Sequence, residues 1–163
     1  MYQLGHVGVA LLAYAPLGMA VAFAGSETLA VVGGLVCVSL STLPDCDHDL
    51  PLLEHRGLTH TVGFAVLVGA VLAVAAAVFV LDSGSFTTDP IVPFAFVVGT
   101  LSILSHLLAD AITPMGIRPF RPLSSYHYTA DLTPAANPIA NYALLAVGVC
   151  VTGVWVGLVT ALS

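Results

Sequence analysis

The stretch TVGFAVLVGAVLAVAAAVFVL, residues 61–81, contains no charged side chain. A helix needs about 20 consecutive apolar residues to cross the hydrocarbon core of a bilayer. We therefore predict that the apolar segment 58–81 forms a transmembrane helix. The second apolar segment along the chain, residues 28–43, is short for a span, so it is expected to tilt little or to lie buried among the other helices. The remaining predicted spans are residues 4–25, 28–43, 91–112 and 138–162.

The composition of the whole chain agrees with this pattern. Of 163 residues, 58% are hydrophobic and 7% are charged, whereas a soluble domain has about 25% charged residues. A soluble helical protein with an unusually apolar core is the alternative, and the lengths of the apolar runs argue against it. The fold class predicted is all-α: a single domain over residues 1–163, built as a polytopic bundle of about five transmembrane helices.

The few basic residues bear on partners and orientation. The net charge is −6, there is no lysine, and the chain has only three arginines. This excludes a basic patch that could neutralise nucleic-acid phosphates. Arg56, Arg118 and Arg121 lie in links that fall on one side of a five-span topology, together with the N-terminus. By the positive-inside bias, that side is predicted to be cytoplasmic, in a multi-pass protein of the inner (cytoplasmic) membrane.

Polar chemistry is concentrated between the second and third spans. The link LPDCDHDLPLLEHRGLTH, residues 43–60, holds four of the nine acidic residues and three of the six histidines. The five-span topology also brings the starts of the first and third spans and the end of the fourth to this side. Ionisable residues at membrane depth usually mark function, and a cation is their natural common partner. The candidate metal ligands are His6, Asp45, Asp47, His48, His55, His60, His106 and Asp110.

Imidazole and carboxylate ligands suit Zn²⁺ first, with Mn²⁺ or Fe²⁺ as alternatives. The candidates outnumber the ligands of one tetrahedral ion, so one or two ions are expected, with Asp45 or Asp47 as a bridging carboxylate in the second case. A bound metal lowers the pKa of water, and Arg56 could clamp an anionic oxygen. The candidate catalytic residues are Asp47, Arg56 and His60.

Structural alternatives exist for several of these residues. His6 could be an interfacial cap, and Asp45 could cap a turn. His55 and His60 could be a solvated pair in a loop. His106 and Asp110 are four residues apart, so they could form a hydrogen bond within one helix.

In these motifs the chain resembles the YdjM-like membrane-bound proteins, which are predicted metal-dependent hydrolases. The family pattern is an early His, then PDxDH, HRGxTHS and SHxxxDxxTxxG. This chain has His6, PDCDH at 44–48, HRGLTHT at 55–61 and SHLLADAITPMG at 105–116, with Thr61 where Ser is usual. The resemblance spans nearly the whole chain. It implies a small helical membrane protein and a polar site of Asp45, Asp47, His48, His55, His60, His106 and Asp110, with Arg56 beside it.

Three functions follow from these observations. The first is a membrane-embedded hydrolase that cleaves a phosphoester of a lipid or lipid-linked substrate with a metal-activated water. The second is a metal-ion transporter or a metal-binding membrane protein without catalysis, whose site should lie near the bilayer midplane. The third is a scaffold in which the polar cluster only holds helices together. Residues 113–137, rich in proline, are expected to form an ordered loop or re-entrant turn.

Overall fold

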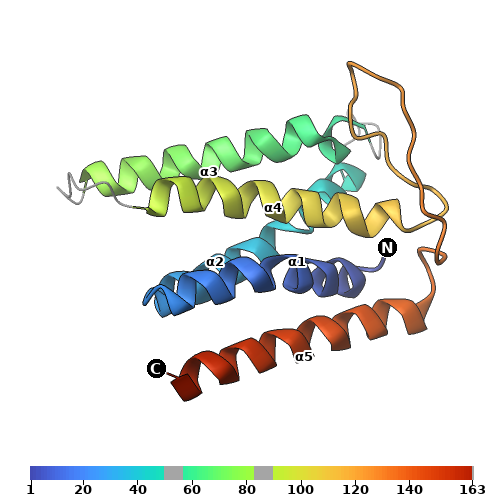
Figure 1. Cartoon of the computed structure of the whole chain (residues 1–163). Coiled ribbons are helices and arrows are strands. Elements are labelled where there is room, and N and C mark those ends of the chain that lie inside the picture. The colour runs from blue at the N-terminus through green and yellow to red at the C-terminus, as the bar shows by residue number, and fades with distance from the viewer. Residues whose placement is uncertain (50–56, 83–89, 163) are drawn as a thin grey trace.

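The computed structural model describes residues 1–49, 57–82 and 90–162, with the backbone alone for residues 47–49 (Figure 1). Within these ranges the chain is all-helical. The five α-helices are α1 (Gln3–Phe23), α2 (Glu27–Leu40), α3 (Val62–Asp82), α4 (Ile91–Ala111) and α5 (Pro138–Leu162). Two 3₁₀ helices, η1 (Leu43–Asp49) and η2 (Leu58–His60), precede α3.

The helix lengths match a bilayer. The helices α1, α3 and α4 have 21 residues each, so each is about 32 Å long, close to the hydrocarbon thickness of about 30 Å. The helix α2 has only 14 residues, but with the residues that follow it as far as Cys46 it forms a candidate span of 20 residues, Glu27–Cys46. The prediction of five spans is confirmed, although the third helix begins at Val62 instead of residue 58.

Small residues let the helices pack closely. The helix α1 packs on α2, α4 and α5, and α4 also packs on α3 (Figure 1). A Cβ atom added to Gly99 of α4 would lie 2.9 Å from the Cα atom of Gly69 in α3. A Cβ atom on Gly148 of α5 would lie 2.6 Å from the carbonyl oxygen of Gly8 in α1. Glycine is therefore required at both helix crossings.

The outer surface of the bundle is apolar, and polar side chains lie in its interior at one end. The outward face of α3 exposes large apolar side chains such as Val74 and Phe79, which is expected of a helix that faces lipid. The second span was expected to tilt little or to be buried. Burial is wrong, because α2 packs on α1 and α4 but leaves Val31 and Leu35 exposed, and a small tilt stays a prediction. Histidine and aspartate side chains are buried at the end of the bundle that holds the N-terminus.

Residues 112–137 form an ordered loop over that end, as predicted (Figure 1). Ile117 and Tyr128 pair their backbones in an isolated antiparallel bridge. The amides of Ala130 and Leu132 donate hydrogen bonds to the carbonyls of residues 111 and 112 at 2.8 and 2.9 Å. The loop thus satisfies carbonyls that the end of α4 leaves without helical partners, and it fixes the end of the helix that carries two of the polar residues.

Candidate metal centre

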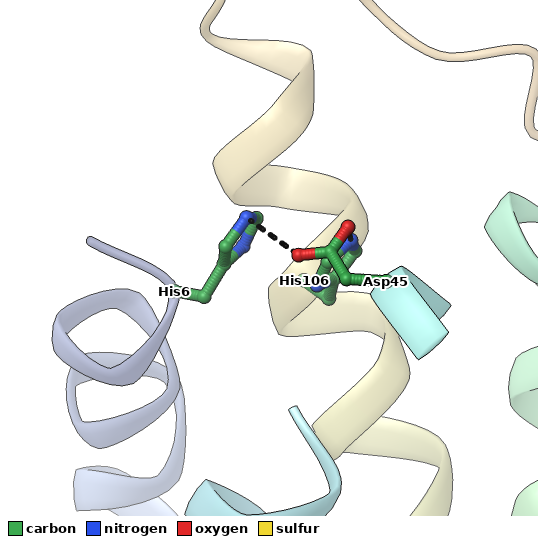
Figure 2. Close-up of side chains that lie close together, drawn as sticks. All are labelled: His6, Asp45 and His106. Carbon is green, nitrogen blue, oxygen red and sulfur yellow. Dashed lines mark ion pairs between the residues drawn. The ribbon is translucent and has the colours of Figure 1, made fainter. Parts of the chain in front are cut away.

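Five of the predicted ligands meet at one end of the bundle. His6 comes from α1, Asp45 from η1, His60 from η2, and His106 and Asp110 from α4. Figure 2 shows His6, His106 and Asp45 converging from three separate elements. Four of the five side chains are at most 1% exposed, whereas Asp45 is 33% exposed. The cluster is therefore buried and is reached from the side of Asp45.

Five of the six distances among four donor atoms of this cluster lie near the edges of a tetrahedral ligand set. The Nε2 atoms of His60 and His106 are 3.1 Å apart. Each of these nitrogens is 3.6 Å from Oδ1 of Asp45 and 3.6 Å from Oδ2 of Asp110. Zinc bonds of about 2.0–2.1 Å to nitrogen and oxygen give tetrahedral edges of about 3.3–3.4 Å. The donor set and its dimensions therefore fit a divalent cation.

Hydrogen bonds behind the two rings orient them toward the centre. Nδ1 of His106 donates to the carbonyl oxygen of Ser41 at 2.7 Å, so a neutral His106 ring turns the lone pair of Nε2 toward His60 and the two carboxylates. Nδ1 of His60 lies 3.0 Å from the hydroxyl oxygen of Thr59. Metal-binding histidines are usually held in this way by a hydrogen bond from the other ring nitrogen.

His6 lies near the other oxygen of each carboxylate. Its Nε2 atom is 3.7 Å from Oδ2 of Asp45 and 3.8 Å from Oδ1 of Asp110. The His6 ring stacks on the His106 ring, with a centroid separation of 4.0 Å and an angle of 6° between the planes. Neither ring nitrogen of His6 makes a hydrogen bond to any residue that the structure describes. The amino group of Met1 donates to Oδ1 of Asp110 at 3.1 Å.

The electrostatics of the cluster favour a cation. Two carboxylates and three imidazoles share a space that is closed to solvent except at Asp45. Burying ionised carboxylates is costly unless they are paired or bind a metal. The amino group of Met1 pairs with Asp110, and a bound cation would balance the remaining negative charge. The alternative of a hydrogen bond within α4 does not account for the geometry, because Nε2 of His106 and Oδ2 of Asp110 are 3.6 Å apart, beyond hydrogen-bond range.

The comparison with known families agrees with the motifs. The profile of the YdjM inner membrane protein family matches residues 1–163. The chain belongs to this family. No curated protein sequence and no solved structure matches the chain. Membership in the YdjM family, together with five helices long and apolar enough to cross a membrane, makes the protein a multi-pass inner membrane protein.

The structure gives roles to several residues of the YdjM motifs that are not candidate ligands. The hydroxyl of Thr61 accepts a hydrogen bond from the amide of Phe64 at 3.1 Å and donates to the carbonyl of Leu58 at 2.7 Å. It therefore caps the start of α3 and fixes the neighbouring His60. Thr113 donates to the carbonyl of Asp110 at 2.8 Å. Gly116 has a positive φ of 58°, which allows the chain to turn after α4.

Four predicted site residues of the YdjM motifs cannot be placed. Asp47 and His48 belong to η1, but their side chains lie outside the described part of the structure. His55 and Arg56 lie outside the described residues altogether. Their assignment as ligands or catalytic groups therefore stays a prediction.

The sequence reading missed one residue that positions the site, Asn141. Its side chain is fully buried. Oδ1 accepts a hydrogen bond from the amide of Tyr2 at 3.0 Å, and Nδ2 donates to the carbonyls of Asn137 and Ala135 at 2.7 and 3.1 Å. These bonds tie the start of α5 to the start of α1, which carries His6. An amide side chain within an otherwise apolar span was the signal that could have identified it.

Proposed function

We propose that the protein is a membrane-embedded, metal-dependent hydrolase that cleaves a phosphoester of a lipid or lipid-linked substrate. The observation that carries this proposal is the pair of imidazole nitrogens 3.1 Å apart, each 3.6 Å from one oxygen of Asp45 and one oxygen of Asp110, in a cluster that is buried except at Asp45. A divalent cation bound there, most readily Zn²⁺, lowers the pKa of a coordinated water to about 7 and supplies a nucleophile at neutral pH.

The protein residues have separate tasks in this proposal. His60, His106 and Asp110 hold the cation on the closed side of the site, where the helices exclude water. Asp45 completes the ligand set at the open side, from which water and substrate enter. The predicted catalytic residues Asp47 and Arg56 belong to the same link, where a guanidinium could bind phosphoryl oxygens.

The depth of the site favours a hydrolase over a transporter. His6 follows the first residue of α1 by three positions, and His106 precedes the last residue of α4 by five. At 1.5 Å per residue these positions lie about 5 and 8 Å from the helix ends, whereas the midpoint of a 21-residue helix is about 16 Å away. Transporter sites lie near the bilayer midplane. A site near the helix ends is instead within reach of lipid headgroups.

The surface around the site supports a lipid substrate. In the loop over this end, Leu123 is 95% exposed and Leu132 is 75% exposed, as expected of side chains that face lipid. The same loop carries Arg118 and Arg121, which can bind anionic headgroups. Two arginines at this end of the bundle also favour a cytoplasmic location of the site and the N-terminus.

The test is hydrolysis by purified protein in lipid nanodiscs loaded with Zn²⁺, Mn²⁺ or Fe²⁺. Phospholipids and polyisoprenyl phosphoesters are offered, and released products are measured by mass spectrometry. We expect turnover that chelation abolishes and that His60→Ala lowers at least about 100-fold, which is about 2.7 kcal/mol of activation free energy. Asp47→Ala and Arg56→Ala test the two residues outside the described side chains.

His127→Ala is the matched control. His127 is exposed in the loop at the same end, and its Nε2 donates to the carbonyl of Met115 at 2.9 Å. Turnover that is equal in His60→Ala and His127→Ala would contradict the proposal. Metal-loaded protein that hydrolyses none of these substrates but moves the ion into vesicles would indicate a transporter instead.

A further inference from the structure

We infer that the cluster binds two cations, held 3.5–4 Å apart by two bridging carboxylates. The first cation has His60, His106, Oδ1 of Asp45 and Oδ2 of Asp110 as its ligands. The second has His6, Oδ2 of Asp45 and Oδ1 of Asp110. This inference rests on the metal binding in the proposed function and adds a second ion with ligands of its own.

The stacked rings of His6 and His106 indicate that these two histidines bind different ions. An imidazole nitrogen binds a metal with a lone pair that lies in the plane of the ring. The His6 and His106 planes are within 6° of parallel, and their centroids are 4.0 Å apart. Rings in van der Waals contact are separated by about 3.5 Å or more. An ion in the plane of one ring is therefore out of the plane of the other. The ring orientations thus disfavour a shared ion, although donor atoms of His6, Asp45 and His106 all lie within 4.8 Å of one another.

His60 and His106 show the opposite geometry. Their ring planes meet at 69°, and their Nε2 atoms are 3.1 Å apart. Planes that intersect at this angle can both contain the same ion. The ring orientations thus favour one ion for the pair His60 and His106 and a separate ion for His6.

The two oxygens of each carboxylate face different histidines. Asp45 turns Oδ1 toward His60 and His106, and it turns Oδ2 toward His6. Asp110 turns Oδ2 toward the pair and Oδ1 toward His6. Each carboxylate therefore presents one oxygen to each side, which is the arrangement of a bridge between two ions. Oδ1 of Asp110 also accepts from the amino group of Met1 at 3.1 Å.

His6 needs such a partner. Its side chain is 0% exposed, and neither ring nitrogen has a hydrogen-bond partner among the residues that the structure describes. Buried polar side chains nearly always have a partner. A cation between Nε2 and the two carboxylate oxygens that face it supplies one.

The second ion changes the charge of the site. One divalent cation neutralises the carboxylates of Asp45 and Asp110. Two give a net charge of +2 over the described ligands, because the imidazoles are neutral as ligands. Such a site attracts the anionic phosphoester of the proposed substrate, and two ions at this separation can hold both the attacking and the leaving oxygens.

The experiment is a measurement of metal stoichiometry on the folded, full-length protein. Chelated protein in nanodiscs is titrated with Mn²⁺, and bound metal per chain is measured by mass spectrometry and by electron paramagnetic resonance. We expect two ions in wild-type protein with the signal of a spin-coupled pair, one uncoupled ion in His6→Ala, and two coupled ions in the control His127→Ala. X-ray absorption on Zn²⁺-loaded wild-type protein should show a metal–metal distance of about 3.5–4 Å.

The outcomes separate this inference from the proposed function. One ion in both wild-type protein and His6→Ala, with no metal–metal vector, would overturn the second site and leave the hydrolase proposal standing. No bound ion in the wild-type protein would overturn both. Two ions without coupling, or two that persist in His6→Ala, would show that the second ion binds elsewhere. If His6→Ala fails to fold, as judged by its helical circular dichroism, the coupling and the metal–metal vector of the wild-type protein still decide the matter.

Discussion

Asp110→Asn should remove most of the stability that the protein gains from metal. The carboxylate of Asp110 is 1% exposed, and its Oδ2 atom is 3.6 Å from the Nε2 atoms of both His60 and His106. Asparagine has nearly the same volume, so the change removes a charge and a ligand oxygen without leaving a cavity. The informative quantity is the difference between the melting temperatures with and without metal, because effects of the substitution on the metal-free fold cancel in it.

The size of the effect follows from binding linkage. At a free metal concentration of 100 times Kd, a ligand stabilises the native state by about 2.7 kcal/mol. For a chain of this size that corresponds to an increase in Tm of about 5–11 °C. Loss of residues that merely support metal ligands costs about 10–100-fold in affinity, so loss of a ligand should cost at least about 100-fold. The stabilisation at the same metal concentration then falls to about 0.4 kcal/mol, or about 1–2 °C.

The assay is thermal unfolding in nanodiscs, followed by circular dichroism with chelator and with Zn²⁺ or Mn²⁺. Asp131→Asn is the matched control, because Asp131 is exposed and has a φ of 46°, a conformation that asparagine tolerates. The control should keep the wild-type response to metal. If Asp110→Asn gains as many degrees from metal as the wild-type protein, Asp110 is no ligand and the geometric reasoning fails.

Two further predictions concern packing and orientation. Gly99→Ala should lower the free energy of unfolding by about 1–3 kcal/mol through overpacking against Gly69. Gly153→Ala is the control and should be neutral or stabilising, because the added methyl group has open space around it. Equal effects of the two substitutions in a denaturant titration would refute the close crossing of α3 and α4. Cys46 is exposed at the site end, so a membrane-impermeant maleimide should label it in inverted vesicles and not in intact spheroplasts. The reverse labelling pattern would place the site outside the cell.

The sequence predicted the spans well and the site in part, for different physical reasons. Apolar runs as long as 61–81 have few alternatives to a transmembrane helix, so the five helices were found with small errors at their ends. The location of His6, His60 and His106 on one side of the membrane followed from topology alone, because an even number of crossings returns the chain to the same side. The division of the carboxylate oxygens between two groups of histidines depends on side-chain rotamers, which no spacing rule specifies.

The early end of α2 helps to position the ligands of the candidate metal site. Because the helix ends at Leu40, the carbonyl of Ser41 has no helical partner and accepts the hydrogen bond from Nδ1 of His106 at 2.7 Å. One turn earlier, the hydroxyl of Ser102 donates to the carbonyl of Cys37 at 2.6 Å and holds α4 against the end of α2. The chain then tightens into η1, which turns Asp45 toward the histidines. A longer α2 would use the carbonyl of Ser41 internally, so the early end of this helix fixes both the orientation of one predicted ligand and the position of another.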